Sequence, residues 1–216
     1  MSSQITAEEI VTATLSHVPF DGWSASSISM GASDCGASED ELARLLPRGV
    51  TDAIETYAKM ADEDMVSAFD ALSDKPEKMH LKIRALILCR LEMAMPHKEA
   101  VSKTVAYLAQ PSHAALALKL LYKTVDSMWR AAGDISTDAS FYSKRATLAA
   151  VYSATLLAFL ADDSGDLSKT EAFLDRRLKE VAAIPKLTAP AKAVMAKTSA
   201  IASQIFEAAM SKSRPR

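Results

Sequence analysis

The feature that most constrains the fold of this chain is a run of sixteen residues, 146–161, without a charged side chain. Ala and Leu dominate the run, so it is predicted to be a helix that is apolar on all sides. Such a helix must be covered on every face, and the run is shorter than the roughly 20 residues that span a bilayer. We therefore expect it at the centre of a domain, in a subunit interface, or along a cavity for an apolar ligand.

The remaining residues favour helix as well. Ala, Leu, Met, Lys and Glu are plentiful, while Gly and Pro number only six and eight in 216 residues. Thr6 with Glu9, and Ser38 with Glu41, have the spacing of capping boxes at helix starts. The sequence thus predicts an all-α protein. Helices are expected over residues 6–18, 24–31, 38–46, 48–72, 77–95, 97–110, 111–132, 139–161 and 168–183.

The order of the first helices resembles the N-terminal three-helix, helix-turn-helix unit of TetR-type regulators. Asp21-Gly22-Trp23 stands where that family has a Gly-aromatic turn. Pro76 begins a second part, and Pro185 and Pro190 bracket a linker. We expect three parts: a TetR-like unit over residues 1–72, a C-terminal helical domain over 73–184, and a linker with an amphipathic helix over 185–216.

The charge of the first part argues against binding to DNA. Residues 1–70 hold three basic and thirteen acidic side chains, and the expected recognition helix places Glu39, Asp40 and Glu41 against Arg44. Affinity for DNA comes largely from Lys and Arg at the phosphates. We expect no nucleic-acid partner; a TetR-type transcriptional regulator that responds to an apolar ligand is the alternative.

Catalytic and metal-binding signals are weak. Glu77-x-x-His80 has half of the pattern of a di-iron carboxylate site, but no second Glu-x-x-His occurs. The chain has no phosphate-binding Gly loop, CxxC or HExxH motif. We expect no catalytic residues, no metal and no cofactor.

The segment 125–145 is the best candidate for a recognition surface. Tyr122, Asp126 and Trp129, at i, i+4 and i+7, share one flank of the helix over 111–132. Trp129 either packs at the margin of the core or serves as an aromatic anchor beside an acidic residue, which is typical of a protein-binding hot spot. Both interpretations stay open at this point.

The last helix, over residues 191–210, is amphipathic and basic. Lys192 and Lys197 flank an apolar arc that includes Ile201, Ile205 and Phe206. Such a helix suits a membrane surface with anionic lipid, which makes these five residues candidate membrane contacts. The alternative is that the helix packs back onto protein.

Several strings of residues are similar to the family of ubiquinone biosynthesis accessory proteins known as the ninth Coq protein. The resemblance covers roughly residues 6–183, and its most specific part is the Met-Trp, Ala-Gly-Asp and Ser-Thr-Asp series. The matching strings are Asp126-Ser127-Met128-Trp129, Ala132-Gly133-Asp134, Ser136-Thr137-Asp138, Tyr142 with Arg145, Ala149-Ala150-Val151-Tyr152, Asp162-Asp163-Ser164, and Phe173-Leu174 with Arg177.

The resemblance implies a TetR-like fold without DNA binding, present as a homodimer, with an apolar pocket for isoprenoid lipid in the C-terminal helices. It further implies that the protein presents a quinone precursor to the demethoxyubiquinone hydroxylase at the membrane. The family's partner-binding patch carries over to Asp126 and Trp129, and Tyr122 is an extension from the helical wheel. The lack of the organellar members' longer N-terminal extension suggests a cytoplasmic protein on the inner membrane face.

Overall fold

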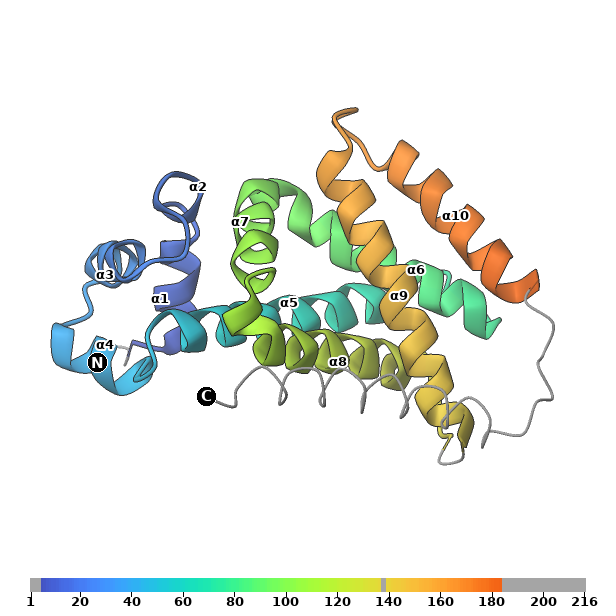
Figure 1. Ribbon diagram of the computed structural model, residues 1–216, viewed down its shortest axis with the longest axis horizontal. Helices are drawn as coiled ribbons and strands as arrows, with labels where there is room; N and C mark the ends of the chain where they lie inside the picture. Colours follow the sequence, from blue (N-terminus) through green and yellow to red (C-terminus); the bar gives the residue numbers. More distant parts are fainter. Residues whose placement is uncertain (1–4, 137–138, 184–216) are drawn as a thin grey trace, which may run out of the picture. The chain divides into compact units, whose positions relative to one another are not determined.

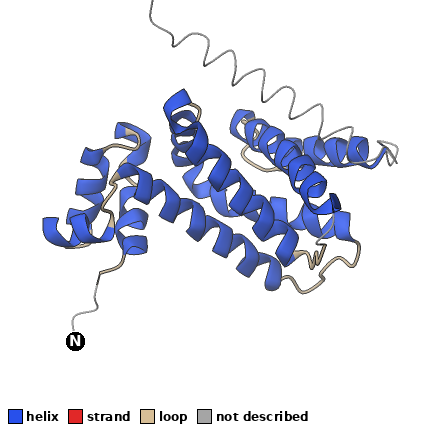
Figure 2. Ribbon diagram, turned by 60° about the horizontal axis from the view of Figure 1, so that its bottom comes forward, coloured by secondary structure: helices blue, strands red, loops and turns tan. Residues whose placement is uncertain are grey.

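The structure of the 216-residue chain is a computed structural model, and it describes residues 5–136 and 139–183. The chain divides into two units, Met1–Lys179 and Glu180–Arg216, and the architecture below is that of the first. Within the described ranges each regular element is a helix (Figure 2), which confirms the expected all-α class. The predicted boundaries after residues 72 and 184 stay predictions.

The helices of the first part of the chain, in order, are α1 (Ala7–Thr14), α2 (Val18–Asp21), α3 (Ala25–Asp34), α4 (Glu39–Leu45) and the long α5 (Val50–Asp70). Side-chain caps begin α1, α3 and α4. Thr6 and Ser38 each form a reciprocal capping box with the glutamate three residues on, so both predicted boxes are confirmed.

The rest of the described chain forms longer helices, of which α6 and α8 pack against α5. Figure 1 shows α5, in teal, running from the N-terminal helices to lie alongside α6 and α8. Their bounds agree with the expected ranges to within one turn. They are α6 (Met79–Ala94), α7 (Lys98–Leu108), α8 (Ala114–Ala131), α9 (Ala139–Ala161) and α10 (Ser168–Ala183), with the one-turn helices η1 (Met95–His97) and η2 (Pro111–His113).

Two boundaries near the N-terminus differ from the expected ones. α1 ends at Thr14, and Pro19 lies in the first turn of α2, where its missing N–H removes no helical hydrogen bond. α3 continues to Asp34 instead of ending at Gly31. Gly31 is buried against α1, so this glycine allows two helices to approach closely and does not end the helix.

Replacing Gly31 with Ala is expected to destabilise the protein by about 1–3 kcal/mol, because the new methyl group overpacks the α1–α3 contact. A Cβ there would lie 2.2 Å from Thr14 Oγ1, 2.6 Å from its backbone N and 2.7 Å from its Cα. Shortening Thr14 cannot relieve the backbone contacts. Urea unfolding of Gly31→Ala beside Ser33→Ala, at an exposed position of α3, measures the effect. Equal unfolding midpoints for the two variants would contradict the close approach.

The turn after α2 links the first helices to α7. Gly22 has φ of +63°, a conformation that favours glycine, and directs the next residue into the core. The Trp23 indole Nε1 donates to Thr104 Oγ1 on α7 at 2.8 Å, and its ring centroid lies 5.7 Å from that of Tyr57 on α5. The Gly-aromatic turn seen in the sequence is therefore a packing link between α2, α5 and α7.

The uncharged run in α9 is covered on one side only. Val151, Tyr152 and Phe159 are buried, whereas Ala150 is exposed and Leu157 is 58% exposed. Within one chain, the described residues therefore leave part of this run uncovered, and the expectation that it is covered on every face stays a prediction. Part of the run also lines a cavity, which is one of the three environments expected of it.

Asp162 fixes the loop between α9 and α10. Its carboxylate accepts hydrogen bonds from the N–H and hydroxyl of Ser164, and from those of Thr170 at 3.1 and 2.8 Å. These bonds, with Ser164 contributing most, hold the pKa of Asp162 well below its usual range. The Asp162-Asp163-Ser164 string is therefore a structural loop that starts α10.

Candidate functional site

An apolar cavity lies among helices α5, α6, α7, α8 and α9. Its volume is about 550 Å³, within the range of about 300–1,000 Å³ that small-molecule sites occupy. The family resemblance implies such a pocket in the C-terminal helices, and here α1 and α5 line it as well. Most of its wall is aliphatic, as in Leu91, Val101, Val105, Leu121 and Leu156.

Apolar side chains of this wall also reach solvent. Met93 on α6 and Leu157 on α9 line the cavity and are 48% and 58% exposed. An exposed aliphatic side chain at the edge of an apolar cavity allows an apolar ligand to enter without crossing a polar barrier. We regard these two residues as part of the cavity mouth.

One side of the cavity wall is polar. Arg90 on α6 lines the cavity; its Nη1 lies 2.9 Å from Asp62 Oδ1 on α5, and its Nε donates to the Tyr152 hydroxyl on α9 at 3.2 Å. The Thr124 hydroxyl on α8 donates to Asp62 Oδ2 at 3.2 Å. These four residues, here named the Arg90 cluster, join four helices at one point.

The Arg90 cluster holds a largely desolvated ion pair, with Arg90 11% and Asp62 14% exposed. Burial raises the pKa of Asp62, and the Arg90 guanidinium opposes that rise. Such pairs seldom add net stability over apolar residues of the same volume, because desolvation offsets their attraction. The Arg90–Asp62 ion pair lies beside an otherwise aliphatic cavity, which suggests that Arg90 contributes to ligand binding.

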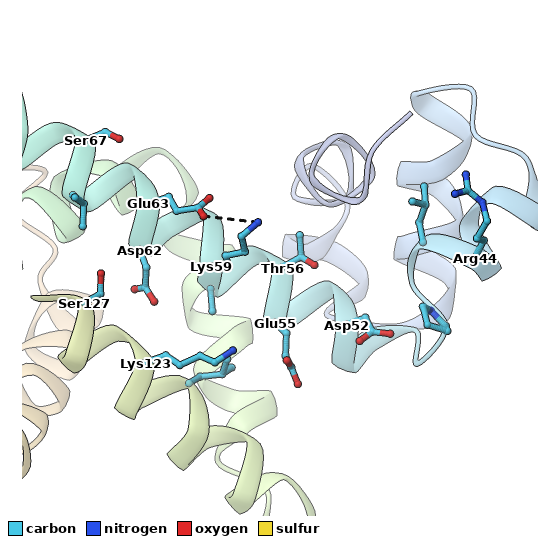
Figure 3. Close-up of a pocket in the computed structure, with 15 residues that line it drawn as sticks. Arg44, Asp52, Glu55, Thr56, Lys59, Asp62, Glu63, Ser67, Lys123 and Ser127 are labelled. Atoms are coloured by element: carbon cyan, nitrogen blue, oxygen red, sulfur yellow. Dashed lines mark ion pairs between the residues drawn. The ribbon is translucent and has the colours of Figure 1, made fainter. Parts of the chain in front are cut away.

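A polar groove lies on the other side of Asp62, between α5 and α8. Figure 3 shows Glu55 and Asp62 on α5 close to Lys123 on α8. The groove has a volume of about 890 Å³, and ion pairs such as Lys59–Glu63 at 3.8 Å occupy its edge. Asp62 therefore faces the polar groove while its ion-pair partner faces the apolar cavity.

The three predicted partner-binding residues have different environments. Tyr122 is 50% exposed on α8, and Trp129 is half-buried. The Lys144 ammonium lies 5.6 Å from the centroid of the Trp129 ring, while the buried Nε1 of Trp129 has no hydrogen-bond partner among the described residues. Tyr122 and part of Trp129 are thus available to a partner protein.

Asp126 is held by two arginines. One carboxylate oxygen accepts from Arg145 Nε at 2.8 Å, and the other lies 2.6 Å from Nε of Arg130. Arg145 also lies 3.5 Å from Asp134, whose pKa is lowered by its bonds from Lys144 and Ser136. The Asp126 side chain is therefore part of the link between α8 and α9, which sequence reasoning did not foresee.

Known proteins match this chain over most of its length. The COQ9 family model matches residues 114–185, which include α8, α9 and α10. "Ubiquinone biosynthesis protein COQ9, mitochondrial" from Xenopus tropicalis is 33% identical over 180 residues, covering 80% of this chain and 56% of that protein. The protein of the same name from Homo sapiens is 32% identical, covering 79% of this chain and 56% of its own length.

The chain belongs to the COQ9 family. The residues that carry the resemblance in the sequence lie mainly in the stretch that the family model matches. This member spans just over half the length of the curated relatives that it matches.

The fold of this COQ9-family chain is also found among transcriptional regulators. A crystal structure of the TetR transcriptional regulator from Nitrosomonas europaea ATCC 19718 aligns with a TM-score of 0.63 over 82% of this chain and 97% of the other. The two sequences are 20% identical, so the likeness shows the fold alone. The expected TetR-like fold is confirmed.

Two further features of the sequence are the Glu77-x-x-His80 pattern and the candidate membrane contacts. Glu77 precedes α6 while His80 lies in its first turn, and no set of three or more metal-ligating side chains occurs within residues 5–136 and 139–183. In the same ranges no helix is both long and apolar enough to cross a membrane. The five candidate membrane contacts, Lys192, Lys197, Ile201, Ile205 and Phe206, lie outside the described residues.

Sequence reasoning missed the polar side of the cavity, although a signal was present. Arg90 occupies an otherwise apolar helix face in α6, beside Leu86, Ile87 and Leu91. A lone arginine within an apolar stripe indicates a buried partner. Its partner, Asp62, is the first of three consecutive acidic residues on α5, Asp62-Glu63-Asp64, and could not be chosen among the acids of α5 without the fold.

Proposed function

We propose that this COQ9-family chain is a non-enzymatic, lipid-binding accessory protein of ubiquinone biosynthesis. The names of its relatives supply the pathway. The observation that carries lipid binding is the apolar cavity of about 550 Å³. Burying each methylene of an isoprenoid tail there contributes about 0.8 kcal/mol, so the aliphatic wall suits a long hydrocarbon chain.

The proposed mechanism is presentation of a quinone precursor. The cavity takes up the isoprenoid tail, and a surface formed by Tyr122, Trp129 and the Asp126 that braces them docks the demethoxyubiquinone hydroxylase. The basic C-terminal residues rest on the bilayer as a peripheral contact, and two copies act together as a homodimer. Each of these steps is a proposal, and none requires a covalent reaction on this chain.

Lipid binding is tested by extracting the purified protein with organic solvent and analysing the extract by mass spectrometry. We expect a co-purifying isoprenoid or quinone lipid. Ala61→Phe, which fills the cavity, is expected to reduce the lipid content, whereas Ala150→Phe at an exposed position of α9 leaves it unchanged. An extract without lipid from the wild-type protein would contradict the proposal.

Docking of the hydroxylase is tested at the two accessible aromatic residues. Trp129→Lys and Tyr122→Lys are each expected to weaken binding by about 30-fold or more, the effect of losing a hot-spot side chain. Phe20→Lys, at an 85% exposed aromatic residue on α2, serves as the control. A pull-down in which all three variants retain the hydroxylase equally would remove this surface from the proposal.

A TetR-type regulator is the alternative, and its test is retardation of DNA. α4 carries Glu39, Asp40 and Glu41 in its first turn, and among its residues Arg44 is the basic one. Acidic side chains at a DNA-facing helix repel phosphates. We expect no salt-sensitive retardation of genomic fragments, and a shift that weakens steeply with salt would favour the regulator.

A further inference from the structure

The polar side of the cavity contains hydrogen-bond donors that the protein leaves unused. Tyr57 on α5 lines the cavity, and its hydroxyl makes no hydrogen bond to any described residue. Tyr152 accepts a hydrogen bond from Arg90 Nε, so its own hydroxyl proton stays available. Both tyrosines and Arg90 line the cavity.

The Tyr57 hydroxyl stays neutral over the physiological range. Burial raises the pKa of Tyr57 to about 12, although the charge of Arg90 acts in the opposite direction. A buried phenol of this kind donates a hydrogen bond and does not ionise. A ligand beside it is therefore expected to offer an acceptor.

The charges around the cavity decide which acceptor fits. Among the described lining residues Arg90 is the one Lys or Arg, and Asp62 already neutralises it at 2.9 Å. Asp64, which is exposed and also lines the cavity, adds negative charge. Apart from the paired Arg90 and the exposed imidazole of His97, the described lining offers no cation to a phosphate or diphosphate, which would therefore enter at a large desolvation cost. A neutral oxygen acceptor meets no such penalty.

We propose that Tyr57, Tyr152 and Arg90 bind the head of an isoprenoid ligand through a neutral oxygen acceptor, as in the carbonyl of a benzoquinone ring. The tail then lies along the aliphatic wall of α7 and α8, where Val101, Val105 and Leu121 line the cavity. This inference rests on the proposed lipid binding and adds the ligand's orientation and the residues that bind its head group. A cavity that only required an apolar tail would not need a buried arginine in its wall.

Tyr57→Phe is the decisive variant, because it removes a hydroxyl that has no partner among the described residues and leaves the ring packed on Trp23. The apo protein is therefore expected to unfold at the same denaturant concentration as the wild type. Tyr142→Phe, at a 73% exposed tyrosine of α9 that does not line the cavity, is the matched control.

The experiment is a binding titration of both variants and the wild type with three probes: a short-chain ubiquinone, farnesene as a hydrocarbon without a head, and farnesyl diphosphate. We expect Tyr57→Phe to weaken ubiquinone binding by about three- to tenfold, the effect of one lost hydrogen bond, and to leave farnesene binding unchanged. The wild type should bind ubiquinone more tightly than farnesyl diphosphate.

Two results would contradict the proposed head-group site of Tyr57, Tyr152 and Arg90 and still leave lipid binding supported. The first is equal affinity of Tyr57→Phe and the wild type for ubiquinone, with farnesene bound by both. The second is tighter binding of farnesyl diphosphate than of ubiquinone by the wild type. If none of the three probes binds, the proposed function and this inference fail together.

Discussion

Replacing Arg145 with Met is expected to lower the free energy of unfolding by about 3 kcal/mol, because it removes the buried cation that Asp126 and Asp134 share. Each carboxylate is left with a more exposed cation, Arg130 for Asp126 and Lys144 for Asp134. The Arg145 guanidinium lies 2.7 Å from Asp126 and 3.5 Å from Asp134, with its Cζ 3.4 Å from the Phe141 ring centroid. Its side chain is 6% exposed. One substitution therefore removes the contact that joins the end of α8 to the start of α9.

Arg130→Met is the matched control for this result. Arg130 pairs with the same carboxylate, at 2.6 Å from Asp126, but its side chain is 76% exposed. Water screens an exposed pair, so its loss is expected to cost about 1 kcal/mol or less. Urea denaturation of both variants measures the difference. If Arg145→Met proved no more destabilising than Arg130→Met, the burial of the α8–α9 link would be contradicted.

The Arg145 result also bears on the proposed docking surface. Trp129 lies in the same region of α8, and the Lys144 ammonium is 5.6 Å from the centroid of its ring. If Arg145→Met loosens the α8–α9 link, hydroxylase binding is expected to weaken although no docking residue has changed. Asp126 would then act by holding α8 against α9, while Tyr122 and Trp129 make the contacts with the hydroxylase.

The second large effect is expected at the Arg90 cluster. Asp62→Ala leaves the Arg90 guanidinium buried without a counter-charge, and we expect it to lower the free energy of unfolding by about 3–5 kcal/mol. Asp64→Ala, at an exposed position two residues away on α5, is expected to change it by less than about 0.5 kcal/mol. Urea denaturation of the two variants tests the contrast.

A double substitution separates the lost charge from lost packing. Asp62→Leu with Arg90→Met replaces the ion pair by apolar side chains of similar volume, which is expected to recover most of the stability. The same double variant should bind ubiquinone less tightly, because the donor from Arg90 is gone. If the double variant were as unstable as Asp62→Ala, the loss would come from packing and not from an unpaired charge.

Helices and their caps could be predicted from the sequence because they depend on close neighbours. The Thr6 and Ser38 capping boxes join residues three apart, and the uncharged run appears as α9 with the expected bounds. Gly31 misled the prediction because a glycine at a helix end and a glycine at a helix crossing look alike in one sequence. What distinguishes them is the position of Thr14 on another helix.

The candidate site was predictable in part. The aromatic residues Tyr122 and Trp129 could be selected from helical spacing and family resemblance, and an apolar pocket could be expected from the apolar helices. The structure adds that both oxygens of Asp126 are occupied within the chain. It also places Tyr57 and Arg90, from two helices, on one cavity wall.

The sequence by itself determined the all-α class, the caps, most helix bounds and the acidic character of the first part. Only the tertiary structure decided which charges are buried together, as with Asp62 and Arg90 on different helices, or Asp126 and Arg145 nineteen residues apart. Hydrogen bonds of a helix link residues within one turn, so the local sequence specifies them. Pairing between helices depends on how all the helices cross, and that arrangement is set by the close packing of the whole core.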